Sequence, residues 1–137
     1  MAENEKLNQK PQDLDLVEIM KTSRVLDLKQ LQFLLNYDKM RFFSWGVSEM
    51  RGFKDENQQV KVARLKVNGF LHKGFVYIRC NGADLFDFYL QDSKGSISKK
   101  VNDIYADQLA HLIDENIEHD GDKDKYNSMV NKTYNNG

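Results

Sequence analysis

Residues 75–90 alternate between two kinds of side chain, and this alternation constrains the fold more than any other feature of the chain. In "FVYIRC" (75–80) and "LFDFYL" (85–90), every second position is apolar, and the positions between them are mostly aromatic or charged. Because successive side chains of a β-strand point to opposite faces, each segment is predicted to be a strand with one apolar face. An Asn-Gly pair at 81–82 lies between them, which favours a hairpin.

The pairing of these two strands depends on the length of the turn. A two-residue turn would set Val76 opposite Asp87 and would mix core side chains with charged ones. A three-residue loop over 80–82 instead pairs Val76 with Phe86, which keeps the aliphatic face whole. We therefore predict the second register, with Gly82 in the left-handed position of a type I turn followed by a G1 bulge.

Two earlier segments also have the period of a strand. "FFSWGV" (42–47) sets Phe43, Trp45 and Val47 in alternation, which is typical of a strand rich in aromatic residues. "VKVARLKV" (60–67) changes phase near Ala63-Arg64, and a β-bulge there would restore the alternation. With that bulge, one face of the strand carries the apolar side chains Val60, Val62, Leu65 and Val67. The other face carries the polar side chains Lys61, Lys66 and Asn68.

Helical spacing appears at both ends of the chain. Asp13 is a candidate N-cap for a first helical segment, and Asp27, with Gln30 three residues later, forms a capping-box pattern for a second. Whether 14–35 is one bent helix or two short ones stays open, with a break expected over 23–26. A final amphipathic helix is predicted from the apolar stripe formed by Val101, Ile104, Tyr105, Gln108, Leu109, Leu112, Ile113, Asn116 and Ile117.

This order of elements predicts an α+β fold. Four consecutive strands joined by short turns form an antiparallel four-stranded meander, with an N-terminal helix (or two short ones) and a C-terminal amphipathic helix packed on it. We expect a single domain over 13–119, between a disordered N-terminal tail (1–12) and a flexible polar C-terminal tail (120–137).

The composition excludes several classes of protein. A chain of 137 residues with 40% hydrophobic residues is long enough for one domain with its own core. No apolar run approaches the roughly 18 residues that a membrane span needs, and the start of the chain has no signal-peptide pattern. The single cysteine rules out an internal disulfide. We expect a cytoplasmic protein, or one in a host cell or virion if the source is a phage or mobile element.

The sequence offers weak signals for catalysis. The three histidines lie far apart in the predicted topology, and no phosphate-binding glycine motif is present. Asp84, Asp87 and Asp103 are candidates to meet at a sheet edge and hold Mg²⁺ for a nuclease or hydrolase, but the usual strand signature of such a site is missing. We therefore expect a protein that is not an enzyme and needs neither cofactor nor metal, and keep the metal hydrolase as the least favoured alternative.

The predicted second face of the sheet is the candidate binding surface. Residues 21–100 carry fifteen Lys and Arg against eight Asp and Glu, so this part of the chain is basic. On the second face of the predicted strands, these cations alternate with aromatic rings. The candidate surface consists of Trp45, Lys61, Lys66, Phe75, Tyr77, Arg79 and Tyr89. We interpret the chain as a non-catalytic adaptor, accessory or inhibitor protein that binds another protein, or itself in a homodimer, through a sheet face or edge. The alternative is nucleic-acid binding by base stacking and phosphate neutralisation.

Overall fold

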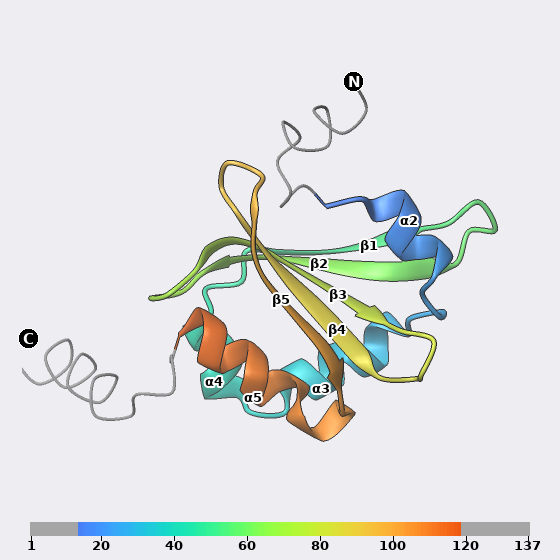
Figure 1. Cartoon of the computed structure of the whole chain (residues 1–137). Coiled ribbons are helices and arrows are strands. Elements are labelled where there is room, and N and C mark those ends of the chain that lie inside the picture. Colours follow the sequence, from blue (N-terminus) through green and yellow to red (C-terminus); the bar gives the residue numbers. More distant parts are fainter. Residues whose placement is uncertain (1–13, 119–137) are drawn as a thin grey trace, which may run out of the picture.

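A computed structural model of the chain describes residues 14–118 (Figure 1). The elements in chain order are α2 (Leu16–Lys21), α3 (Leu28–Asn36), α4 (Lys39–Ser44), β1 (Glu49–Lys54), β2 (Val60–Asn68), β3 (Lys73–Cys80), β4 (Phe86–Asp92), β5 (Ile97–Ile104) and α5 (Ala106–Ile117). Within the described range, no helix is both long and apolar enough to span a membrane. The two predicted tails lie outside the described residues.

The strands form one five-stranded sheet in the order β1-β2-β3-β4-β5, and each pair of neighbours is antiparallel. The α+β class and the meander are therefore confirmed, while the predicted number of four strands is wrong. Helices α3, α4 and α5 lie on one side of the sheet, and the short helix α2 lies on the other (Figure 1). Each face of the sheet thus has its own hydrophobic cluster.

The fifth strand, β5, occupies residues that the sequence placed in the final helix and the link before it. Val101 pairs with Phe88, and Ile104 pairs with Phe86. Two register shifts interrupt this pairing, so the apolar residues of β5 do not alternate regularly and fit a helical spacing instead. The final helix begins only at Ala106, and its buried stripe consists of Leu109, Ile113 and Ile117.

Residues 39–44 form helix α4, so the strand predicted over 42–47 is wrong. The Asp38 carboxylate caps the helix by accepting from the backbone N–H of Arg41 at 3.1 Å. Trp45 is the C-cap of the helix, and Gly46 follows with a φ of +60°. A Cβ at Gly46 would lie 3.0 Å from the carbonyl oxygen of Asn68, so glycine relieves both the dihedral and the contact.

The faces predicted for β3 and β4 are confirmed, but their register is not. Val76 pairs with Leu90 rather than with Phe86, because the connecting loop has five residues, 81–85, instead of three. The side-chain oxygen of Asn81 accepts from the backbone N–H groups two and four residues later, at 2.9 and 3.2 Å. Asp84, not Gly82, takes the left-handed conformation, with a φ of +65°.

The irregularity in β2 lies earlier than predicted. Phe53 pairs with Val62 and Lys54 with Val60, so the extra residue is Lys61 rather than one at 63–64. Val60 consequently packs with the cluster under α3 and α5, whereas Val62 lies in the cluster on the α2 side. The prediction that these two valines share one face is therefore wrong.

The N-terminal segment forms two short helices, which settles the alternative that the sequence left open. The carboxylate of Asp27 accepts from the backbone N–H groups of Lys29 and Gln30 at 3.0 and 3.2 Å, so the predicted cap of α3 is confirmed. Helix α2 is capped by Asp15, which accepts from Glu18 N–H at 3.1 Å. Asp13, the predicted cap, lies outside the described residues.

The larger core lies between the sheet and helices α3, α4 and α5. Its fully buried side chains come from both layers: Leu31, Leu35, Trp45, Leu65, Val76, Ile78, Phe88, Leu109, Ile113 and Ile117. Burying one large apolar side chain contributes roughly 1.5–3 kcal/mol, so this layer supplies most of the drive for docking the helices. It also fixes which helix surfaces remain available to a partner.

Candidate functional site

The seven residues predicted to form a binding surface do not gather on one exposed surface. Trp45 is 0% exposed, and Tyr77 and Tyr89 are each 5% exposed. The two tyrosines pack with Val62 beneath residues of the α2 segment, which include Ile19. Because α2 packs on this face, both tyrosine rings are covered and unavailable to a partner.

The remaining four predicted residues divide between internal contacts and the surface. Lys61 donates to the carbonyl oxygen of Ser23 at 3.1 Å and lies 3.9 Å from Asp55. Arg79 is held by a buried carboxylate on the neighbouring strand β4. Lys66 is exposed and Phe75 is half-buried, so these two alone of the seven are available to a partner on the α2 side of the sheet.

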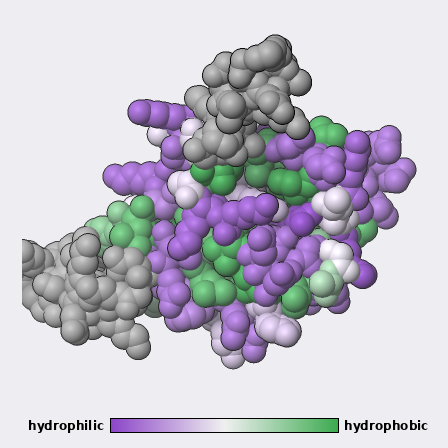
Figure 2. Space-filling model, viewed as in Figure 1, coloured by the Kyte–Doolittle hydropathy of each residue, from purple (hydrophilic) through white to green (hydrophobic). Residues whose placement is uncertain are grey.

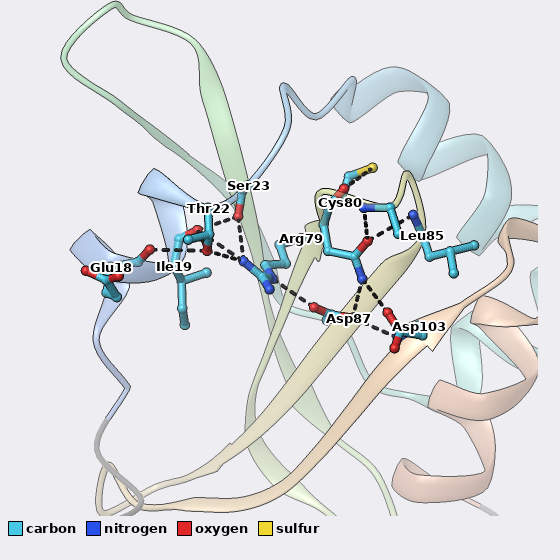
Figure 3. Close-up of polar contacts among 11 residues, drawn as sticks. Glu18, Ile19, Thr22, Ser23, Arg79, Cys80, Leu85, Asp87 and Asp103 are labelled. Atoms are coloured by element: carbon cyan, nitrogen blue, oxygen red, sulfur yellow. Dashed lines mark hydrogen bonds and ion pairs between the residues drawn. The ribbon is translucent and has the colours of Figure 1, made fainter.

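A buried polar network joins the sheet to α2 (Figure 3). Asp87 is 2% exposed, and its Oδ2 accepts from Arg79 Nε at 2.9 Å. Its Oδ1 accepts from Asn81 Nδ2 at 2.9 Å and from the backbone N–H of Asp103 at 2.8 Å. Arg79 also donates to the hydroxyl of Thr22 at 2.6 Å. The network therefore satisfies a charge that would otherwise be costly to bury.

The three aspartates proposed as Mg²⁺ ligands, Asp84, Asp87 and Asp103, do not form one metal site within residues 14–118. Asp87 and Asp103 lie together, because both accept from Asn81 Nδ2 at 2.9 Å. Asp87 uses both oxygens in the buried network, and Asp84 accepts from the Cys80 thiol at 3.5 Å. Burial raises the pKa of Cys80, and the adjacent Asp84 raises it further, so the thiol form is favoured over the reactive thiolate. In this same part of the chain, no group of three or more His, Cys, Asp or Glu side chains is placed to hold a metal ion.

The histidines have separate surroundings. His72 is 8% exposed, and its Nε2 donates to the carbonyl oxygen of Phe75 at 3.1 Å. His72 is therefore part of the packed β2–β3 end of the sheet and not a surface histidine. His111 is exposed and lies 2.9 Å from Glu115, one turn later on α5. His119 lies outside the described residues.

Large apolar side chains are exposed on two neighbouring helices. On α3, these are Phe33 (66% exposed) and Tyr37 (82%), the C-cap of the helix; on α4, they are Met40 (81%) and Phe43 (82%). Phe33 and Tyr37 touch edge to face, with ring centroids 6.1 Å apart. We call these four residues the α3–α4 apolar surface. The opposite side of α3 buries Leu31 and Leu35 in the core.

The α3–α4 apolar surface was not predicted, although the sequence carries a signal for it. Phe33 and Tyr37 are four residues apart and Met40 and Phe43 three apart, outside the stripe that includes Leu31. On the side of the molecule seen in Figure 2, apolar atoms show in several separate groups between polar side chains. The assignment of 42–47 to a strand hid the surface, because it put Phe43 in phase with Trp45 on a strand and not on a helix that follows Tyr37.

Cations and rings alternate across the part of the α2-side sheet face formed by β1, β2 and β3. The guanidinium carbon of Arg51 lies 4.9 Å from the centre of the Phe53 ring. That of Arg64 lies 5.3 Å from the Phe53 ring and 4.4 Å from the Phe75 ring. We call these four residues the cation–aromatic strip. Arg64 is further fixed by Glu49, whose Oε1 accepts from it at 3.0 Å.

A buried carboxylate lies beside the β2–β3 turn. Glu118 is 6% exposed, and its Oε2 accepts from the backbone N–H of Phe70 at 3.0 Å. Burial raises the pKa of Glu118 and the nearby Asp114 adds to this, while the hydrogen bond from Phe70 lowers it. The folded protein therefore binds a proton at Glu118 more tightly than the unfolded chain does.

This raised pKa gives a stability prediction with a definite sign. The folded-state pKa of Glu118 lies above its ordinary value of 4.5. The protonated side chain therefore contributes its full stabilisation below pH 4.5, and this stabilisation is lost as the pH rises through the folded-state pKa. We expect Glu118→Gln to raise the melting temperature at neutral pH, with a smaller gain at about pH 4. Thermal unfolding at both pH values, with the exposed Glu56→Gln as control, measures this. An equal gain at both would contradict it.

Neither a family model, a curated protein nor a solved structure matches this chain.

Proposed function

We propose that the chain is a small non-catalytic interaction protein that binds another protein through the α3–α4 apolar surface. The supporting observation is that four large apolar side chains, Phe33, Tyr37, Met40 and Phe43, are between 66% and 82% exposed on adjacent helices. Single exposed apolar residues are common on any protein, but grouped ones mark sites of interaction.

The residue types of this surface suit a protein partner. Aromatic residues and methionine are enriched at the centres of protein interfaces, where they fill pockets on the partner. Met40 adds an unbranched side chain that adapts to an irregular pocket. The rings of Phe33 and Tyr37 already touch one another, so less side-chain freedom is lost when a partner binds.

Charges around the surface indicate the character of the partner. Helices α3 and α4 and the turn between them carry Lys29, Lys39 and Arg41 against the single acid Asp38. Asp38 lies 3.9 Å from Arg41, which leaves the two lysines to set the local charge. A partner with an apolar pocket and an acidic rim is therefore favoured.

Crosslinking tests this proposal even when the partner has not been identified. A photoreactive phenylalanine analogue is placed at position 43 of the full chain, and at position 17 in a control, because Val17 is also exposed (60%) but lies on α2. We expect a discrete crosslinked product from position 43 in a lysate of the source cells, and none from position 17. The same pattern from both positions would contradict the proposal.

Paired substitutions then measure the contribution of the surface. Met40→Ser combined with Phe43→Ser should weaken binding of the crosslinked partner by at least tenfold, because truncating a central interface residue commonly costs more than about 1.4 kcal/mol. The matched control, Val17→Ser with Val25→Ser, removes two other exposed apolar residues and should change binding less than twofold. If the product is a second copy of the chain, sedimentation should show a dimer that the Met40/Phe43 variant lacks.

A further inference from the structure

We propose that the cation–aromatic strip, which is separate from the α3–α4 apolar surface, binds single-stranded nucleic acid. The strip consists of Arg51 and Phe53 on β1, Arg64 on β2 and Phe75 on β3. Ladder partners point to the same face, and Arg51 pairs with Arg64 and Lys66 with Phe75. Phe53 and Phe75 pack against the cluster that also includes residues of α2, so this is the face on which α2 lies. Helix α2 and the residues before it pack with the buried tyrosines Tyr77 and Tyr89 of this face.

The sheet face around the cation–aromatic strip is strongly biased towards positive charge. Strand alternation places Arg51, Arg64, Lys66 and Lys73 on this face, and Glu49 is the single acid that β1, β2 and β3 contribute to it. Arg79, on the same face, is already neutralised by Asp87. Arg51, Lys66 and Lys73 are exposed. A chain of phosphates would meet three accessible cations within a few neighbouring positions.

The rings and guanidinium planes supply stacking as well as charge. Phe53 stacks on the buried Tyr77 with ring centroids 6.3 Å apart and an angle of 29° between the rings. Arg51 lies over Phe53, and Arg64 lies between Phe53 and Phe75. Nucleobases stack on aromatic rings and on guanidinium planes alike. Because these groups are held by their neighbours before binding, little ordering is required.

This geometry favours a single strand over the other polyanions that the charge alone would attract. In a duplex the bases are already stacked on one another, so the rings of the strip would have no base face to contact. An acidic peptide would neutralise the cations, but carboxylates gain nothing from stacking on Phe53 or Phe75. The combination of planar groups with cations therefore selects unpaired bases linked by phosphates.

Fluorescence anisotropy with a labelled oligothymidylate of about 15 nucleotides, a length within the range of single-strand binding sites, tests the proposal on the full chain. With three or four phosphate contacts, the logarithm of the binding constant should fall with the logarithm of salt concentration with a slope of about −2 to −3, at roughly 0.7 per contact. Arg51→Ala combined with Lys66→Ala should reduce the magnitude of that slope by about 1.4 and weaken binding at least tenfold. Both side chains are exposed, so the variant should fold normally.

Two further variants separate stacking from charge. Phe75→Leu keeps an apolar side chain and should weaken binding about tenfold with an unchanged salt slope, because stacking contributes without releasing ions. Lys29→Ala with Lys39→Ala removes two cations from α3 and α4 and should leave binding unchanged. The proposal is overturned if no binding occurs at low salt, if the two double variants lose affinity equally, or if a duplex or polyglutamate competes as well as the single strand.

Discussion

We expect Asp87→Ala to lower the free energy of unfolding by about 3–5 kcal/mol, which is typical of removing one partner from a buried ion pair. Asp87 is 2% exposed, so water does not replace the lost contacts. The substitution leaves the Arg79 guanidinium without its carboxylate and the backbone N–H of Asp103 without its acceptor. A single domain is usually stable by only about 5–15 kcal/mol, so the loss is a large share of the total.

Urea unfolding followed by circular dichroism measures this effect. The control is Asp107→Ala, because Asp107 is an exposed carboxylate in the first turn of α5 and should cost at most about 1 kcal/mol. A double variant, Arg79→Met with Asp87→Leu, should recover part of the lost stability, since it removes both buried charges together. Equal costs for Asp87→Ala and Asp107→Ala would show that the network does not stabilise the fold.

The faces of β3 and β4 were predictable from the sequence even though their pairing was not. The predicted register sets Val76 opposite Phe86, and the observed one sets it opposite Leu90. The two registers differ by four residues, and a shift by an even number leaves every side chain on the same face. The length of the loop depends on the hydrogen bonds that Asn81 makes with Ala83 and Leu85, which a local turn signal does not specify.

The two misassigned elements have a common physical cause. In α4, Phe42 is half-buried against Trp45, whereas its neighbour Phe43 is exposed. The helix has six residues, which are too few to distinguish a helical period from an alternating one. In β5, bulges break the alternation, so Val101 and Ile104 have the three-residue spacing of a helix. Tertiary packing determines both elements, and local spacing does not.

Only part of the candidate surfaces was predictable. Lys66 and Phe75 were assigned correctly to the second face of the sheet, but the sequence did not show that α2 would cover Tyr77 and Tyr89 beside them. The arginines of the strip lie on β1 and on the part of β2 beyond the irregularity. Arg64 lies on this face because the extra residue is Lys61, so the alternation from Val62 through Arg64 to Lys66 is unbroken, and Arg51 is the ladder partner of Arg64.

Trp45→Ala is the second substitution with a large expected effect, a loss of about 3–5 kcal/mol in the free energy of unfolding. Trp45 is 0% exposed, and its ring packs against Phe42 at a centroid distance of 5.5 Å. Its Nε1 donates to the Asp114 carboxylate on α5 at 2.9 Å, and its carbonyl oxygen accepts from Asn68 N–H on β2 at 2.8 Å. The alanine variant keeps the backbone contact but leaves a cavity between α4, α5 and the sheet.

Trp45→Phe separates the packing from the hydrogen bond. It keeps most of the apolar ring and leaves the half-buried Asp114 without its donor, so its cost should be about 1 kcal/mol, at the lower end for a lost hydrogen bond. Urea unfolding by circular dichroism suits both variants, because the only tryptophan of the chain is the residue being replaced. A competing interpretation is that Trp45 anchors an interface. In that case, Trp45→Ala would abolish partner binding but lower the free energy of unfolding by less than about 1 kcal/mol. The burial of the ring predicts the reverse: a large loss of stability, with the exposed Phe43 two residues earlier as the residue that governs binding.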